Sequence, residues 1–178
     1  MLELKDFEAA YNKVQEVVLP TKLIKSDYFS DQTGNDVYLK PENMQLTGAY
    51  KIRGAYYKIS TLSEEEKAKG LITASAGNHA QGVALAAARQ GVKATIVMPT
   101  TTPLIKVNRT KSYGAEVVLY GNVYDEACQY ALKLAKEKGL TFVHPFNDET
   151  VATGQGTIAM EIFKELPTVD IILVPIGG

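Results

Sequence analysis

The stretch LITASAGNHAQG, residues 71–82, runs from a short apolar segment through a turn of small residues into an alanine-rich helix. The nearly continuous apolar run at 71–73 is typical of a strand that is buried on both faces. The first amides of the following helix have no partners within that helix, and Ser75, Asn78 and Gln81 add polar side chains. We predict a strand, a tight turn and a helix start that can hold a carboxylate or a phosphate. A plain capped turn is the alternative interpretation.

Short β-branched runs and longer helical segments alternate along the rest of the chain. Such an alternation predicts parallel βαβ units with right-handed crossovers, whose ligands bind beyond the carboxyl ends of the strands. Thr102 before Pro103 is typical of a helix start, and Gly91 and Gly139 stand where helices should end. The sequence therefore predicts an α/β fold with a parallel sheet. The predicted strands are 37–39, 71–73, 94–98, 116–120, 141–143 and 171–174, and the predicted helices are 4–19, 49–60, 78–90, 103–113, 123–138 and 155–165.

The composition is that of an ordinary globular protein, with 178 residues, 46% of them hydrophobic, and a mean hydropathy of −0.08. A net charge of −1 argues against a nucleic acid or an anionic membrane as partner. The single cysteine, Cys128, allows no internal disulfide, and with His79 and His144 it makes no plausible zinc cluster. The start of the chain lacks a signal-peptide pattern, and the apolar run near 171–176 is too short for a membrane span. We expect a cytoplasmic protein without a metal, in which Cys128 is a small core residue.

A second unusual stretch, ENMQLTGAYKIRGAY, covers residues 42–56. Thr47 can cap a helix that carries Lys51 and Arg53 in its first turns, where cations oppose the helix dipole. A reactive lysine is one reason to keep that arrangement, and a solvated lysine is the plain alternative. The segment 144–147, HPFN, follows a predicted strand at its carboxyl end, where it either faces a ligand or forms a simple turn.

Two glycine patterns suggest nucleotide sites but fail in context. Gly77 and Gly82 have the spacing of a P-loop, but Val83 stands where a lysine is required. Residues 154–159 match G-x-G-x-x-A, but no buried strand precedes them, so we predict the entry to a helix there instead of a dinucleotide site.

The lysine stretch, the motif SAGNHAQG at 75–82 and the segment VPIGG at 174–178 together resemble the fold-type II pyridoxal-phosphate enzymes. Within that group they are most similar to the catabolic threonine dehydratases, with serine dehydratases and serine racemases as near relatives. The resemblance covers essentially the whole chain. It implies a three-layer α/β/α fold like that of the tryptophan synthase β subunit, with pyridoxal 5'-phosphate as the cofactor. The implied reaction converts L-threonine or L-serine into 2-oxobutanoate or pyruvate, with release of ammonia.

The resemblance also implies roles for individual residues. Lys51 forms a Schiff base with the cofactor and takes the α-proton of the substrate. Tyr50 lies against the cofactor ring, where the family usually has phenylalanine, and Asn78 binds the ring oxygen. The implied substrate-binding residues are Ser75, Ala76, Gly77, Asn78, His79, Gln81 and Phe146, and the implied phosphate-binding glycines are Gly177 and Gly178.

Two positions depart from the family pattern. Ala49 stands where a serine is common, so the hydroxyl group found in relatives is missing or is supplied by Tyr50. Ala76 stands where serine racemases carry the serine that serves the opposite face of the substrate carbon. We therefore expect elimination to dominate over racemisation, and we expect Ala76→Ser to raise the rate of serine racemisation.

The resemblance further implies that 47–150 form a small cofactor-facing domain, with 1–46 and 151–178 as parts of a larger domain. On this basis we expect the chain to cover the N-terminal half of an enzyme and to bind the cofactor weakly by itself. A homo-oligomer, a nucleoside monophosphate effector, and a place in amino-acid catabolism or isoleucine biosynthesis are also implied. The alternatives are a serine racemase or a β-replacement enzyme on the same fold, and a catalytically silent fragment or a regulatory nucleotide-binding module.

Overall fold

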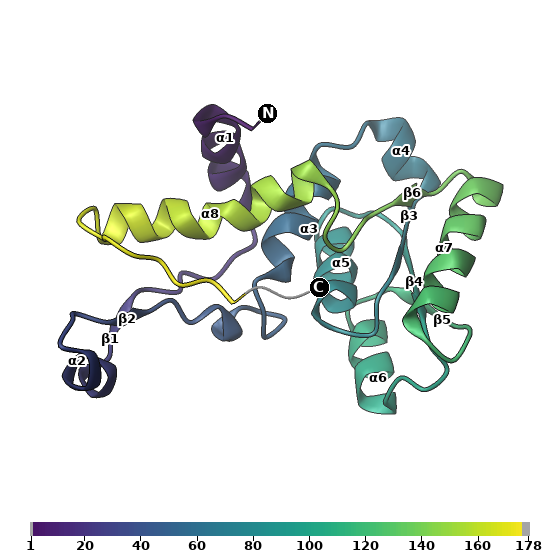
Figure 1. Cartoon of the computed structure of the whole chain (residues 1–178). Helices are drawn as coiled ribbons and strands as arrows, with labels where there is room; N and C mark the ends of the chain where they lie inside the picture. Colours follow the sequence, from purple (N-terminus) through teal and green to yellow (C-terminus); the bar gives the residue numbers. More distant parts are fainter. Residues whose placement is uncertain (1, 176–178) are drawn as a thin grey trace.

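The structure, a computed structural model, describes residues 2–175, so the predicted phosphate-binding residues Gly177 and Gly178 lie outside the described residues. Helices and short strands alternate along the chain (Figure 1). In chain order the elements are α1 (Leu4–Val14), β1 (Ile24–Lys25), α2 (Asp27–Thr33), β2 (Tyr38–Leu39), the 3-10 helix η1 (Glu42–Met44), α3 (Lys51–Ser60), α4 (Glu64–Lys69), β3 (Leu71–Ala74), α5 (Asn78–Arg89), β4 (Ala94–Met98), α6 (Leu104–Ser112), β5 (Glu116–Leu119), α7 (Tyr124–Lys138), β6 (Thr141–Phe142) and α8 (Glu149–Glu165).

The predicted parallel sheet is confirmed. Strands β3 to β6 form a four-stranded sheet in the order β5-β4-β3-β6, and every neighbouring pair is parallel. The chain moves outward from β3 through β4 to β5, and then returns across the sheet through α7 to place β6 on the other side of β3. The strand order therefore reverses beside β3, which is the place where open α/β sheets bind ligands.

Helices cover both faces of the sheet, which gives the expected three layers (Figure 1). Because side chains alternate along a strand, Leu71 packs into a core shared with α3, α5 and α6, whereas Ile72 packs on the opposite face against α7. Right-handed crossovers account for this division, since α5 and α6 connect strands in one direction and α7 connects them in the other.

A second group of helices packs beside this sheet. Figure 1 shows α8 extending away from the sheet toward the β1–β2 ribbon, with α1 and α3 along its length. Two glycines let α3 and α8 touch: a Cβ placed on Gly154 lies 2.6 Å from the Cα of Gly54. The motif at 154–159 therefore serves helix packing, and α8 starts earlier than predicted, at Glu149.

Several predicted elements differ from the structure. No strand forms at 171–174, where Leu173 is 90% exposed, because an apolar run becomes a strand only when a neighbouring strand pairs with it. The strand predicted at 37–39 is β2, which pairs antiparallel with β1 outside the parallel sheet. The helix predicted to reach residue 19 ends at Val14. Helices α2 and α4 were not predicted, since neither buries a residue and neither shows an apolar period.

Two predicted helix caps are also wrong. The N-cap of α3 is Tyr50, and the Thr47 hydroxyl donates to the carbonyl of Ala49 at 3.3 Å. Helix α6 follows Pro103, and the hydroxyl of Thr102 has no hydrogen-bond partner among the described residues. In both cases a nearby side chain of the right type does not reach the free amides of the helix.

Candidate active site

The loops that follow β3 and β6 meet at the carboxyl edge of the sheet, where the strand order reverses. The carbonyl oxygen of Val143, directly after β6, forms hydrogen bonds to residues of β3 and α5. It accepts a hydrogen bond from Thr73 Oγ1 at 2.7 Å, and His79 Nε2 lies 3.2 Å away and donates to it. Thr73, Val143 and His79 are all buried, so this junction lies in the interior of the protein.

His79 is held as a neutral ring. Burial disfavours the imidazolium ion and lowers the pKa of His79 to about 4, because the hydrogen bond to the Val143 carbonyl only partly offsets the lost hydration. With its proton on Nε2, the ring leaves Nδ1 as a buried acceptor that has no partner among the described residues. The site thus contains an imidazole that stays uncharged near neutral pH.

Lys51 is the first residue of α3, and its amine points at the loop after β6. Lys51 Nζ donates to the carbonyl oxygen of Pro145 at 3.0 Å and lies 5.3 Å from the centroid of the Tyr50 ring. A close approach between helices fixes its backbone, since a Cβ placed on Gly82 of α5 lies 3.0 Å from the Lys51 carbonyl carbon. Asn78 lies one turn before Gly82, on the same face of α5. The Lys51 backbone therefore lies against the second turn of α5, and the Lys51 charge helps to lower the pKa of His79, the second residue of that helix.

The start of α5 has no side-chain cap. Its N-cap is Gly77, and a Cβ placed on that residue meets nothing within 4 Å. Ser75 does not cap the helix; its Oγ accepts from the Gly77 amide at 3.2 Å and closes the preceding turn. Because the first amides of a helix lack partners within it and attract anions, this open turn fits a carboxylate or a phosphate.

The remaining predicted site residues differ in their exposure. Ala76 is half-buried between Ser75 and Gly77, and Asn78 is exposed. Gln81 is buried, and its Oε1 has no partner among the described residues. Phe146 is 54% exposed on the opposite loop. The donors of this site, the Lys51 amine and the free amides, fit pyridoxal phosphate and an amino-acid carboxylate, and the described residues contain no cluster suited to a metal ion.

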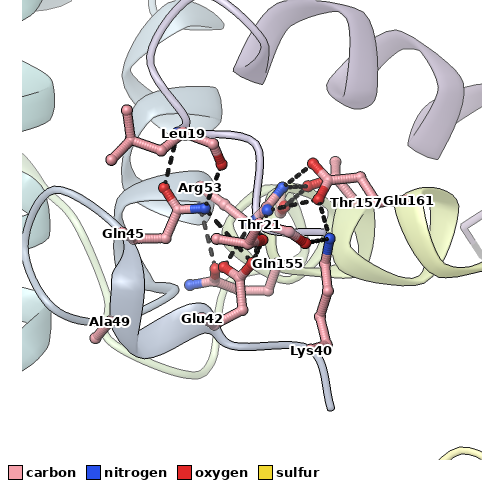
Figure 2. A network of polar contacts seen from close by, with 12 residues as sticks. Leu19, Thr21, Lys40, Glu42, Gln45, Ala49, Arg53, Gln155, Thr157 and Glu161 are labelled. Atoms are coloured by element: carbon pink, nitrogen blue, oxygen red, sulfur yellow. Dashed lines mark hydrogen bonds and ion pairs between the residues drawn. The ribbon is translucent and has the colours of Figure 1, made fainter. Parts of the chain in front are cut away.

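Arg53 has a different role from the one expected for a helix-start cation. Its side chain is fully buried, with Nε 2.8 Å from Glu42 and Nη1 2.7 Å from Glu161, as Figure 2 shows. Lys40 Nζ reaches the same Glu161 at 2.6 Å. Burial alone lowers the pKa of Arg53, but the hydrogen bonds from both carboxylates outweigh it and raise that pKa. Sequence reasoning missed this network because Glu161 lies 108 residues away along the chain.

The chain is similar to known pyridoxal-phosphate dependent enzymes along most of its length. The family model for pyridoxal-phosphate dependent enzymes matches residues 14–178. The L-threonine ammonia-lyase of Thermotoga maritima is 52% identical over all of this chain, which covers 44% of that protein. The catabolic L-threonine dehydratase of Staphylococcus aureus is also 52% identical, and this chain covers 52% of it.

Two solved structures share the fold. Threonine deaminase isoform 2 of Solanum lycopersicum matches with a TM-score of 0.86 and 44% identity, over 93% of this chain and 47% of that one. Maize serine racemase matches with a TM-score of 0.90 and 32% identity, over 94% of this chain and 51% of that one. The chain thus spans about half the length of these relatives. The predicted resemblance is confirmed, and the chain belongs to the family of pyridoxal-phosphate dependent enzymes.

Proposed function

We propose that the protein is a threonine ammonia-lyase, which converts L-threonine into 2-oxobutanoate and ammonia and L-serine into pyruvate and ammonia. The observation that carries the proposal is the position of Lys51 Nζ, bonded to the Pro145 carbonyl beside the uncapped start of α5. An amine next to free amides is the arrangement that an amino-acid substrate needs at its reacting carbon and its carboxylate. The named threonine ammonia-lyase and threonine dehydratase relatives support the choice of substrate.

The chain's own residues have separate tasks in this proposal. The free amides at the start of α5, with Ser75 beside them, hold and orient the substrate carboxylate. Lys51 leaves its bond to the Pro145 carbonyl and takes the proton from the substrate Cα. His79 stays uncharged because of its burial, so it places no second cation beside the Lys51 amine.

Pyridoxal phosphate, when bound, supplies the electron sink for the negative charge that develops at Cα. Lys51, Tyr50 and Asn78 are the residues of the described chain that we assign to hold it. Loss of the Cα proton and the β-hydroxyl removes one water, and a second water then hydrolyses the released enamine to the keto acid and ammonia. The water lost in the first step equals the water consumed in the second, so the net reaction needs no external oxidant or reductant.

The proposal also includes the oligomeric state, the domain division, the location, the pathway and the effector of the protein. The exposed apolar side chains on α6 and along β5, such as Leu104, Ile105 and Leu119, support a homo-oligomer. The division into a small domain at 47–150 and a larger one, the cytoplasmic location, the link to isoleucine biosynthesis and the nucleoside monophosphate effector rest on the family resemblance. None of the helices in the described residues is long and apolar enough to span a membrane.

A keto-acid assay tests the proposal. Pyridoxal phosphate is supplied in large excess, because we expect the chain to bind it weakly by itself. Under that condition the chain should release 2-oxobutanoate from L-threonine, and Lys51→Ala should lower kcat at least about 100-fold because it removes the general base. Lys69→Ala, at an exposed lysine on α4, should keep the wild-type rate. A wild-type chain that is inactive toward threonine but active in sulfide-dependent β-replacement contradicts the proposal, and so does an unchanged Lys51→Ala variant.

A further inference from the structure

His144 lies in the turn between β6 and α8, and its ring nitrogen Nδ1 receives two backbone hydrogen bonds. The amides of Phe146 and Asn147 donate to Nδ1 at 3.2 and 2.8 Å. An acceptor nitrogen needs a free lone pair, so Nδ1 carries no hydrogen in this arrangement. A side-chain acceptor that binds the amides two and three residues further on closes a turn in the way that an asparagine side chain does.

The imidazole is also in contact with two aromatic rings. The Phe142 ring centroid lies 6.0 Å away at 63°, and the Phe146 ring centroid lies 5.2 Å away at 76°. Both are edge-to-face contacts, which favour one orientation of the ring. His144 therefore acts on the turn in two separable ways, by its acceptor nitrogen and by its ring.

The peptide group between Pro145 and Phe146 links His144 to Lys51. It contains the Phe146 amide, which donates to His144 Nδ1, and the Pro145 carbonyl, which accepts from Lys51 Nζ at 3.0 Å. A trans peptide group is planar, and its N–H and C=O point in opposite directions. Fixing the amide on one side therefore fixes the direction of the carbonyl on the other.

We propose that His144 is a positioning residue for Lys51. By holding the Phe146 amide, the unprotonated Nδ1 aims the Pro145 carbonyl at Lys51 Nζ and keeps the amine beside the start of α5. Pro145 suits this place because it is buried and its ring restricts φ, so the remaining freedom of the turn lies mainly in the peptide group that His144 holds. The inference rests on the proposed function in one respect, which is that Lys51 is the reactive amine.

Two substitutions separate the acceptor from the ring. His144→Phe keeps an aromatic ring between Phe142 and Phe146 but has no acceptor, whereas His144→Asn has an acceptor of Asx-turn geometry but no ring. If the acceptor positions Lys51, His144→Phe releases the Pro145 carbonyl and His144→Asn does not.

The test is competitive acetylation of the full chain without added pyridoxal phosphate, with the exposed Lys69 as internal reference. Loss of one hydrogen bond should raise the labelling rate of Lys51 about 3- to 10-fold in His144→Phe, because the freed amine is more accessible. Hydrogen exchange at the Phe146 and Asn147 amides should accelerate by a similar factor. His144→Asn should match the wild type in both measurements.

Unchanged Lys51 labelling in His144→Phe overturns the proposal, as does labelling in His144→Asn that rises to the same level. If His144→Phe does not fold, the His144→Asn result alone decides, since only retained protection of Lys51 agrees with an acceptor role. The proposed function fails separately: a wild-type chain without threonine elimination refutes that function, whereas the labelling result does not depend on catalysis.

Discussion

Lys51 and His79 are two basic side chains at the same edge of the sheet, but their surroundings differ. Lys51 Nζ is bonded to a backbone carbonyl at the margin of the site, whereas His79 is buried and neutral. The family resemblance predicted that both belong to the site. Their partners, the carbonyl groups of Pro145 and Val143, could not be predicted, because a backbone carbonyl has no residue type that marks it in a sequence.

The burial of His79 predicts a pH dependence of stability. The pKa of His79 is about 4 in the folded chain and about 6.5 when exposed. Between these values the unfolded chain binds more protons, so the free energy of unfolding falls as the pH falls. Between pH 7 and pH 5 this contribution is about 2 kcal/mol.

Urea unfolding at both pH values measures the effect of His79. His79→Gln keeps a donor for the Val143 carbonyl but does not titrate, so its loss of stability on acidification should be smaller than that of the wild type by about 2 kcal/mol. Equal losses in the two proteins refute the assignment of a buried neutral imidazole.

Helix α3 packs closely against α5 and α8 because glycines on all three helices leave room for backbone contact. Gly82 of α5 faces the backbone of Lys51, and Gly154 of α8 faces Gly54. The sequence predicted α5 and α7 to within one residue, since a clear apolar period and an end signal such as Gly139 bound them. A sequence pattern does not show which glycines of different helices are in contact. The packing of α3 between α5 and α8 could therefore be seen only in the structure.

Glycine substitutions on α8 test this packing. Gly154→Ala places a methyl group 2.6 Å from the Gly54 Cα, and backbone cannot move aside easily, so we expect a loss of about 1–3 kcal/mol in the free energy of unfolding. Gly156→Ala on the same helix meets only the ring of Phe7, at 2.5 Å, which can rotate. That variant should be close to neutral, because alanine favours the helix by about 1 kcal/mol. Thermal or urea unfolding that ranks the two variants in the opposite order contradicts the close helix contact.

The buried Arg53 network joins distant parts of the whole molecule. It connects η1, α3 and α8, with Lys40 and Thr21 of the N-terminal segment bonded into it (Figure 2). Burial raises the pKa of Glu161, but the hydrogen bonds from Arg53 and Lys40 outweigh it and lower that pKa, so the carboxylate stays charged. The sequence marked Arg53 as unusual, but a pairing across the fold cannot be seen in a local pattern.

Removing Arg53 should destabilise the whole chain. Arg53→Met leaves the Glu42 and Glu161 carboxylates buried with less compensation, and we expect a loss of about 3–5 kcal/mol in the free energy of unfolding. Lys69→Ala, which breaks the exposed pair with Glu65, should cause no detectable change. Urea unfolding of both variants provides the comparison, and an Arg53→Met chain as stable as the wild type contradicts the role of the network.

Peptide mapping after borohydride reduction tests whether Lys51 is the amine that binds pyridoxal phosphate. The full chain is incubated with pyridoxal phosphate, reduced, digested and analysed by mass spectrometry. We predict a single pyridoxyl adduct on the peptide that contains Lys51, and its disappearance in Lys51→Ala while Lys69→Ala retains it. Adducts spread over exposed lysines, with none enriched at Lys51, would contradict the assignment of this site.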